Sequence, residues 1–322
     1  MLRFALCSLA GLLLCAAQLT VAQSFPSRTM RVLVASPPGN PSDIVMRAAA
    51  KELSSRFGVP VIVDNRVGAN EIIMQEACAK APSDGHTLCL VSKDGMSYNP
   101  NVYAKLPYDP DKDYKPVARM YFLISTLAAT GSLPVNSIGE LRELATAKPG
   151  SLNFGTRGVG SNQDIFRQWL GIHWKTEFAG IHYKGTNFIF NALVAGEIHL
   201  TLGSLGNIVS LLQGGKAKLL AVEMSKRSPV MPQVPTFDEA GFEAWPGRPF
   251  WGIVVPANTP NAIASRLNAE LVWLSREPKF VQFMEARYLE LAVGTPEEFA
   301  SFLQSDREKI GQLVRKFNIS TQ

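Results

Sequence analysis

The feature that most constrains the fold is an alternation of short apolar runs and helix-spaced apolar residues, which occurs in two successive series. In the first series, residues 30–36 and 59–63 have the composition of buried strands, and the segment between them has the spacing of a helix that begins at Ser42. A second series starts near Ser137 and ends with a strand at 218–223. Alternating strands and helices predict parallel sheets with helices on both faces, so the expected class is α/β with two doubly wound sheets.

A longer extended segment links the two series. Residues 119–129 are apolar over more positions than one ordinary strand needs, and we expect them to cross from one unit to the other. The strand expected at 251–255 then returns to the first unit. The chain is therefore predicted to form two lobes with crossing hinge strands and a ligand cleft between them, as in hinged binding proteins. The expected boundaries are 23–123 for the first part of lobe I, 124–248 for lobe II and 249–322 for the return to lobe I.

The N-terminal segment has the pattern of an export signal. A basic residue precedes an apolar run, 4–14, that is too short to span a bilayer, and Ala22 ends a small-residue cleavage pattern. We therefore expect residues 1–22 to be a signal peptide, cleaved near Ala22, and the mature chain to lie in the periplasm. The alternative is lipoprotein processing at Cys15, which is disfavoured because Leu14 stands where a small residue is expected.

Composition argues against several classes of function. The chain has 32 basic and 27 acidic residues, and this net charge of +5 is small and scattered, so no nucleic-acid partner is expected. Its 4 histidines are dispersed, and the sequence lacks the nucleophile elbow, the zinc-protease motif and the phosphate-binding loop. We therefore expect no enzyme activity, no metal and no cofactor, and we expect a monomer.

The mature chain keeps two of the 4 cysteines, Cys78 and Cys89. In an oxidising compartment such a pair more often forms a disulfide than two free thiols. Cys78 lies near the end of an expected helix and Cys89 in the strand that follows, and the turn at 82–85 between them lets the two meet. A disulfide between Cys78 and Cys89 is therefore predicted.

Two glycine-bearing loops each join an expected strand to the N-terminus of a helix. The first contains Pro38, Gly39, Asn40, Ser42 and Asp43, and the second contains Thr156, Arg157, Gly158, Gly160, Ser161 and Asn162. Unpaired N–H groups at helix N-termini attract anions, so the two loops, facing each other, would clamp a carboxylate with Arg157 as a bidentate partner. The alternative is that both are ordinary turns with N-caps, where Asp43 pairs with Arg47 one helical turn on.

Several short motifs occur in order along the mature chain, at 64–69, 84–88, 108–114, 148–154, 183–186, 227–241 and 255–260. With these motifs the chain resembles, from end to end, the periplasmic solute-binding proteins of tripartite tricarboxylate transporters, often called the Bug group. None of the motifs is catalytic, and the resemblance rests on their joint occurrence at the family's spacing.

The resemblance implies a two-lobed receptor that closes on a small carboxylate, which is a di- or tricarboxylate, an amino acid or an aromatic acid. It implies delivery of that ligand to the membrane subunits of a secondary transporter. Carried over residue by residue, the proximal positions are Gly39, Asn40, Ser42 and Asp43 with Thr156, Gly158, Gly160 and Ser161, and the distal positions are Ser92, Tyr183 and Ser204. The alternative function on the same fold is a periplasmic ligand sensor that docks on a signalling partner without transport.

The chain departs from the family pattern at the expected site. Asn40 and Pro41 stand where the family usually has a glycine and a serine, and Pro41 removes a backbone donor from the first loop. Arg157 and Asp164 replace what are commonly a serine and a histidine, and the usually glycine-rich segment after Gly68-Ala69 is here 70–74, Asn-Glu-Ile-Ile-Met. We hypothesise that Arg157 compensates for the donor lost at Pro41 and favours a dianion.

Overall fold

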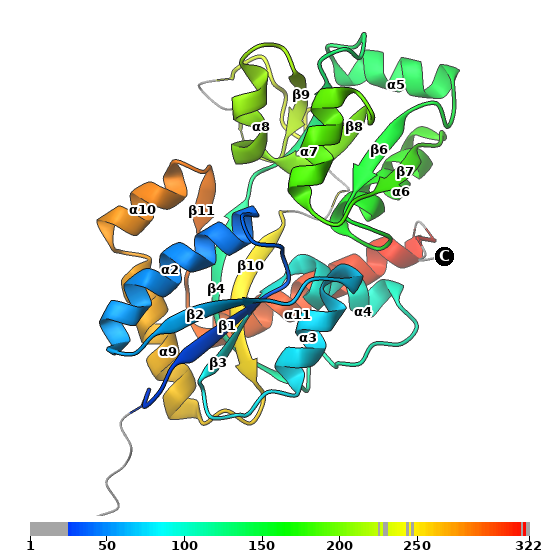
Figure 1. Cartoon of the computed structure of the whole chain (residues 1–322). Coiled ribbons are helices and arrows are strands. Elements are labelled where there is room, and N and C mark those ends of the chain that lie inside the picture. The colour runs from blue at the N-terminus through cyan, green and yellow to red at the C-terminus, as the bar shows by residue number, and fades with distance from the viewer. Residues whose placement is uncertain are drawn as a thin grey trace, which may run out of the picture.

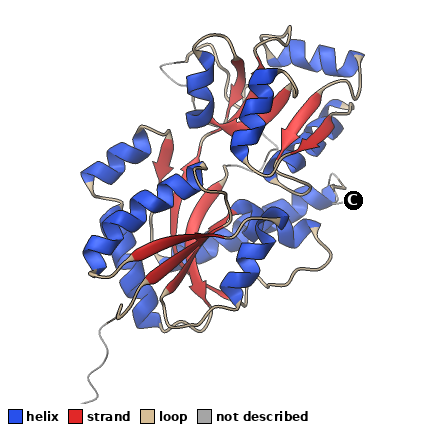
Figure 2. Ribbon diagram, in the orientation of Figure 1, coloured by secondary structure: helices blue, strands red, loops and turns tan. Residues whose placement is uncertain are grey.

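The computed structural model describes residues 25–224, 226–227, 231–242, 245, 248–316 and 318–319, so the predicted signal peptide and its cleavage site lie outside the described residues. Two sheets form two lobes, each flanked by helices, and Figure 1 shows lobe II above lobe I. Figure 2 shows the strands inside each lobe and the helices around them. The predicted two-lobed α/β class is confirmed.

The sheet of lobe I has six strands in the order β11-β4-β10-β3-β1-β2. The strands are β1 (Met30–Val34), β2 (Val61–Asn65), β3 (Thr87–Ser92), β4 (Tyr114–Leu123), β10 (Phe250–Pro256) and β11 (Leu289–Leu291). β1 pairs in parallel with β2 and β3, as predicted. β10 runs antiparallel to both β3 and β4, because it enters the sheet from lobe II at the edge where β4 leaves it, with Phe250 opposite Phe122. The sheet is therefore mixed: the predicted parallel pairing is confirmed for β1 with β2 and β3, and it is wrong where β10 pairs with β3 and β4 and where β11 pairs with β4.

Eight helical segments of lobe I are described. They are α2 (Pro41–Phe57), η2 (Ala69–Glu71), α3 (Ile72–Ala79), η3 (Asp94–Tyr98), α4 (Asn99–Val102), α9 (Asn261–Leu274), α10 (Pro278–Glu285) and α11 (Pro296–Lys316). α2 begins one residue before the predicted Ser42 because proline suits the first helical position, where its missing N–H costs nothing. It ends at Gly58, whose φ of 71° is readily available to glycine.

Lobe II has a five-stranded sheet in the order β7-β6-β8-β5-β9. Its strands are β5 (Ser125–Thr130), β6 (Asn153–Thr156), β7 (Ala179–His182), β8 (Leu200–Ser204) and β9 (Ala217–Val222). Its helices are α5 (Ile138–Ala147), α6 (Asn162–Trp174), α7 (Thr186–Ala195) and α8 (Leu205–Leu212). β6 pairs in parallel with β7 and β8, whereas β5 runs antiparallel to β8 and β9. This sheet is also mixed, because β5 enters from lobe I.

The two sheets are joined by crossing strands. β4 ends at Leu123, β5 begins at Ser125, and Ile124 alone separates them. The predicted crossing segment, 119–129, is therefore confirmed as two strands in two sheets.

The C-terminal helix joins the two cores. Near its start, Phe299 and Leu303 of α11 belong to a core of lobe I. Near its end, Ile310 and Leu313 belong to the aromatic core of lobe II, which includes Trp169. The assignment of all of 249–322 to lobe I stays a prediction, and the packing of α11 places its last turns against lobe II. No helix in the described part of the chain is long and apolar enough to cross a membrane.

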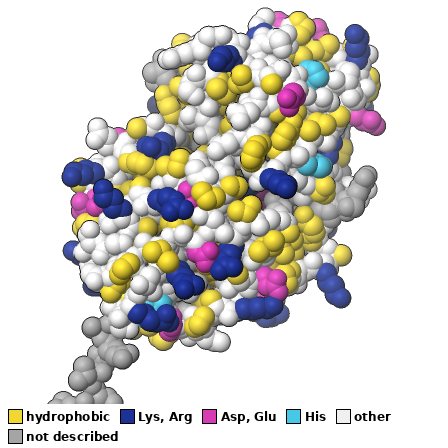
Figure 3. Space-filling view, viewed as in Figure 1, with side chains coloured by type: hydrophobic (Ala, Val, Ile, Leu, Met, Phe, Trp, Pro, Cys, Tyr) yellow, Lys and Arg dark blue, Asp and Glu magenta, His cyan; other side chains and the backbone are white. Residues whose placement is uncertain are grey.

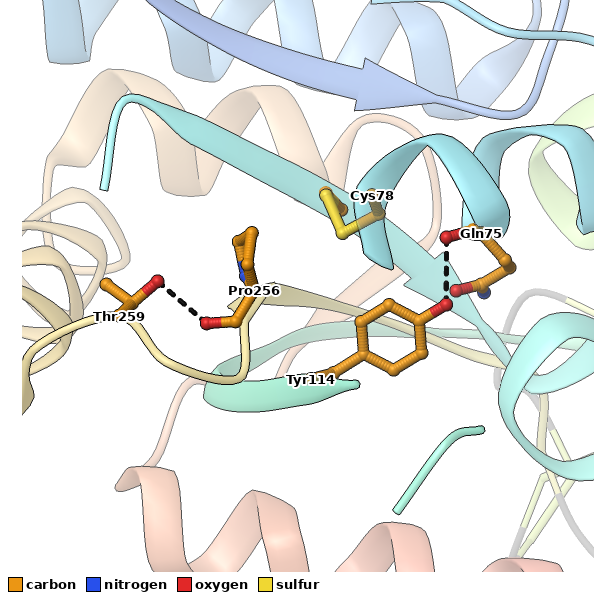
Figure 4. The surroundings of a disulfide bond; sticks show 6 residues. Gln75, Cys78, Tyr114, Pro256 and Thr259 are labelled. Carbon is orange, nitrogen blue, oxygen red and sulfur yellow. Dashed lines mark hydrogen bonds between the residues drawn. A yellow bond between two sulfur atoms is a disulfide. The ribbon is translucent and has the colours of Figure 1, made fainter. Parts of the chain in front are cut away.

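The predicted disulfide is confirmed. The sulfurs of Cys78 and Cys89 lie 2.05 Å apart and tie α3 to β3 (Figure 4). On the same helix, the Gln75 carbonyl accepts a hydrogen bond of 2.9 Å from the Tyr114 hydroxyl of β4. The helix that follows η2 is therefore held to two strands of the lobe I sheet.

Candidate functional site

A cavity of about 100 Å³ lies between the lobes. Lobe I lines it with the loop before α2, the end of β3 and parts of β4 and β10, and lobe II lines it with the N-terminal ends of α6, α7 and α8. The polar and charged lining residues are Ser36, Asn40, Ser42, Ser92, Lys93, Asp94, Ser125, Arg157, Asn162, Gln163, Lys184, Thr186, Ser204 and Asn207. The larger apolar ones are Pro37, Pro41, Tyr121, Leu123, Leu202, Pro249, Trp251 and Leu289.

In the first predicted loop, a backbone N–H is already hydrogen-bonded to a side chain of the helix that follows, α2. Asn40 is the N-cap of α2, but no side-chain hydrogen bond caps the helix there. Instead, the Gly39 N–H donates to Asp43 Oδ2 at 2.8 Å. Asp43 also forms the predicted pair with Arg47, 2.9 Å long, and accepts from Asn65. Burial alone would raise the pKa of Asp43, but the hydrogen bonds from Arg47, Asn65 and the Gly39 N–H hold it below its usual value.

In the second loop, too, a backbone N–H is hydrogen-bonded to a side chain of the helix that follows, α6. The Ser161 hydroxyl accepts from the Asp164 N–H and so caps α6. The Gly160 N–H donates back to Asp164 Oδ2 at 3.1 Å, and the Gly158 N–H donates to Thr156 Oγ1 at 3.2 Å. Gly158 and Gly160 have φ of 127° and 75°, a region that favours glycine. The backbone donors at these glycines therefore already have protein acceptors.

The structure brings part of the predicted site to the cavity. Of the predicted residues, those that line it are Asn40, Ser42, Ser92, Arg157, Asn162 and Ser204. The other predicted residues do not line the cavity. Most of them make hydrogen bonds within the two loops, Tyr183 packs against a core of lobe II, and Pro38 is exposed; the set is Pro38, Gly39, Asp43, Thr156, Gly158, Gly160, Ser161 and Tyr183. Direct ligand contact by any of these residues stays a prediction.

Arg157 is already paired with two carboxylates from lobe I. Its Nη2 donates to Asp94 Oδ2, and its Nη1 lies 3.6 Å from Glu71 Oε1. The Ser92 hydroxyl donates to the Glu71 carboxylate at 2.7 Å. The exposed fraction is 21% for the Arg157 side chain, 3% for Asp94 and 5% for Glu71, so this is a buried ion cluster across the interface of the lobes.

The cluster shifts the pKa of each member. Burial, and then the charge of Asp94, raises the pKa of Glu71 to about 7, against the opposing effect of Arg157. Burial also raises the pKa of Asp94, although Arg157, the Asn162 N–H and Lys93 oppose the shift. Burial would lower the pKa of Arg157, but Asp94 and Glu71 outweigh it and raise it. Arg157 therefore stays charged, and its charge is balanced by the protein itself.

Two buried amide oxygens in the lining lack a hydrogen-bond partner among the described residues. They are Oδ1 of Asn40, at the N-terminus of α2, and Oε1 of Gln163, in the first turn of α6. Asn40 is 4% exposed and Gln163 8%. Buried polar atoms are nearly always hydrogen-bonded, so a donor, either water or a ligand N–H or O–H, is expected beside each oxygen.

The apolar part of the lining is built on an aromatic pair. Tyr121 and Trp251, neighbours on β4 and β10, stack with ring centroids 5.6 Å apart and planes 4° from parallel. Leu123 and Leu289 lie beside them in the lining. This surface suits a flat or aliphatic ligand body.

The lobes also contact each other around the cavity. The Tyr98 hydroxyl of lobe I donates to Asn162 Oδ1 of α6 at 2.8 Å. A Cβ built on Gly185 would lie 3.3 Å from the Asn40 side chain, and one built on Gly206 would lie 2.3 Å from the Arg287 carbonyl oxygen. The two lobes therefore lie in close contact on several sides of the cavity.

Sequence reasoning missed Asp94, Gln163 and the Tyr121–Trp251 pair. Asp94 lies two residues after the end of β3, and ligands of open α/β sheets bind beyond the carboxyl ends of the strands, so its position could have indicated the site. Its pairing with Arg157 joins residues 63 positions apart and has no local signal. Figure 3 shows basic and acidic side chains interspersed on the face drawn, as the scattered charge of the sequence predicts.

Comparisons with known proteins agree with this architecture. Residues 45–319 match the family model described as tripartite tricarboxylate transporter family receptor. The periplasmic binding protein BugD is 26% identical, with a TM-score of 0.85 over 92% of this chain and 100% of that one. A Rhodopseudomonas palustris protein solved with adipate is 26% identical, with a TM-score of 0.86 over 92% of this chain and 99% of that one. MatC of the same organism, solved with bound malate, is 28% identical, with a TM-score of 0.84 over 90% of this chain and 100% of that one.

These similarities cover nearly all of the described chain and confirm the resemblance drawn from its motifs. The family and the fold are those of periplasmic solute-binding receptors rather than of enzymes. The chain belongs to the tripartite tricarboxylate transporter receptor family.

Proposed function

We propose that this chain is an exported receptor that captures a small carboxylate between its lobes and delivers it to the membrane subunits of a tripartite tricarboxylate-type transporter. The observation that carries the proposal is the cavity between the lobes, which places the N-terminal ends of α2 and α6 and unpartnered buried amides around one space. Family membership supports it, as do the adipate and malate bound by two structural relatives. The predicted signal peptide supports export.

Capture follows from the arrangement of the lobes. Residues of both lobes line the cavity, so a ligand in it contacts both and stabilises their closed arrangement. The hydroxyls of Ser36 and Ser42 offer donors from lobe I, and the amide N–H groups of Gln163 and Asn207 offer them from lobe II. These neutral donors hold a carboxylate by hydrogen bonds, while the aromatic pair contacts the rest of the ligand. The closed form then presents a surface built from both lobes to the membrane subunits.

Thermal unfolding of the mature chain tests the proposal. The protein, residues 23–322, is unfolded and refolded to remove bound ligand, and then heated with mono-, di- and tricarboxylates, amino acids and, as controls, neutral sugars. An acid present at 100 times its Kd adds about 2.7 kcal/mol to the stability of the folded state, which shifts Tm by about 5 °C in a protein of this size. We expect such a shift with at least one carboxylate and none with the sugars. A panel without a single stabilising acid would contradict carboxylate capture.

Delivery needs its own measurement. Uptake of the stabilising acid is measured in cells that carry the membrane subunits, with and without this receptor. We expect uptake to depend on the receptor. Uptake that is equal without it would overturn the transport part of the proposal while leaving the binding part intact.

A further inference from the structure

A carboxylate of the protein occupies the anion-binding end of α6. Asp94 belongs to lobe I, two residues after the end of β3, and its Oδ1 accepts from the N–H of Asn162, the first residue of α6, at 3.2 Å. Its other oxygen accepts from Arg157, in the loop before the same helix. A helix N-terminus and an adjacent guanidinium are the groups that a bound carboxylate would use. Asp94 therefore makes the contacts that the sequence assigns to a ligand.

The charges around the cavity are balanced without a ligand carboxylate at this place. Four charged residues in the described part of the chain line the cavity, and three of them lie in ion pairs. Arg157 faces Asp94 and Glu71, and Lys93 pairs with Asp306 at 2.8 Å. The fourth, Lys184, is exposed. A second carboxylate placed near Asp94 and Glu71 would meet like charges in a buried setting, which is strongly unfavourable.

The unpartnered groups in the lining are neutral. Oε1 of Gln163 lies on the first turn of α6, beside the end that Asp94 occupies, and Oδ1 of Asn40 lies across the cavity in lobe I. Both oxygens only accept, so they suit water or a ligand N–H or O–H, whereas the hydroxyls of Ser36 and Ser42 and the amide N–H groups of Gln163 and Asn207 can donate to one carboxylate. The stacked Tyr121 and Trp251 add an apolar surface to the same lining.

We infer that Asp94 stands in for a ligand carboxylate at the N-terminus of α6, and that this receptor selects acids with one carboxylate over dicarboxylates of the same carbon skeleton. The inference rests on the proposed function, since it names the class of acid that the cavity takes. It replaces the hypothesis that Arg157 favours a dianion, because the guanidinium already faces two carboxylates.

Matched pairs of acids test the inference. Calorimetric titration of the mature chain at pH 8, where Glu71 with its pKa of about 7 is ionised, compares hexanoate with adipate, 4-methylbenzoate with terephthalate and butyrate with succinate. In any pair that binds, we expect the wild type to bind the monocarboxylate at least about tenfold more tightly. In Asp94→Asn, which keeps an acceptor for the Asn162 N–H but loses the charge, we expect the preference to fall by about tenfold or to reverse.

The control is Asp164→Asn. This carboxylate also lies at the start of α6, where it accepts from the Gly160 N–H, but it pairs with Arg167 and does not line the cavity. The control removes one buried charge from the same helix end, so its monocarboxylate-to-dicarboxylate ratio should stay at the wild-type value. A change in ratio shared by both variants would overturn the assignment to Asp94.

The possible results separate the role of Asp94 from carboxylate capture itself. A wild type that binds dicarboxylates more tightly overturns the inference while leaving carboxylate capture intact. Absence of binding for every acid, in the wild type and in Asp94→Asn alike, overturns the proposed function and the inference with it. If Asp94→Asn does not fold, the inference is tested by the ratio of monocarboxylate to dicarboxylate affinity in the wild type and by the same titrations on Asp94→Ser. A monocarboxylate preference that persists unchanged in the folded variant shows that Asp94 does not set it.

Discussion

Glu223 gives a prediction that needs no ligand. The residue follows β9, its N–H donates to the Ser125 carbonyl at 2.8 Å, and it is 7% exposed. Burial raises the pKa of Glu223 to about 7 from an ordinary 4.5, against the opposing effects of the Ser125 hydroxyl and the charges of Lys93 and Arg248. Between pH 4.5 and 7 the folded state therefore holds a proton that the unfolded state releases, so the free energy of unfolding falls as pH rises through this window.

The magnitude follows from the size of the shift. The difference between about 7 and 4.5, at 1.36 kcal/mol per pH unit, gives about 3 kcal/mol lost by pH 8 as an upper value. Glu223→Gln mimics the protonated side chain and has no such loss. We expect the variant to match the wild type near pH 4.5 and to exceed it by about 1–3 kcal/mol at pH 8.

Urea unfolding of both proteins at the two pH values measures the difference. The pH dependence of other groups, including Glu71, is common to both proteins and cancels. Glu290→Gln is a control of opposite sign, because the ion pair with Arg248 lowers the pKa of Glu290, so this variant should be less stable than the wild type at pH 8. The reasoning is refuted if Glu223→Gln gains nothing at pH 8, or gains equally at both pH values.

Two further predictions concern closure and the disulfide. A Cβ on Gly206 would lie 2.3 Å from the Arg287 carbonyl oxygen across the lobe boundary, so Gly206→Ala should lower the affinity for the best-binding acid about tenfold in titration. The control is Gly139→Ala, whose added Cβ would have no atom nearer than 3.8 Å and should leave the affinity unchanged. Equal affinities for the two variants would contradict lobe contact as a requirement for binding. Replacing Cys78 and Cys89 by alanine opens a loop of sequence separation 11 and should cost about 3 kcal/mol in urea unfolding, and an unchanged midpoint would show that the disulfide adds no stability.

Much of the fold could be predicted because hydrophobic periodicity reports burial directly. The strand expected at 30–36 is β1 at Met30–Val34, and the one expected at 251–255 is β10 at Phe250–Pro256. The disulfide and the Asp43–Arg47 pair were accessible because their partners are close in sequence. The direction of each strand could not be predicted, since a local pattern does not say from which lobe a strand enters a sheet. For the same reason the sharing of α11 between two cores was not predicted.

The ion cluster at the site could not be predicted from the sequence. Two departures from the family pattern, at Glu71 and at Arg157, stood as separate observations, and in the structure they are one ion cluster completed by Asp94. Ala69, Asn70 and Glu71 have φ of 47°, 47° and 74°, so the backbone keeps a left-handed course that a glycine-rich segment adopts without cost. Such coupling depends on contacts between the lobes, which spacing along the chain does not encode.

Calorimetric titration with the cavity filled tests the central claim most directly. Asn207 lies on α8 and lines the cavity, so Asn207→Trp should occupy the space of the ligand, whereas Ser210→Trp on the exposed part of the same helix should not. With the acid that gives the largest thermal shift, we expect one site per chain in the wild type and in Ser210→Trp, and binding at least about tenfold weaker in Asn207→Trp. Wild-type affinity in Asn207→Trp would contradict the claim that a small carboxylate is captured between the two lobes.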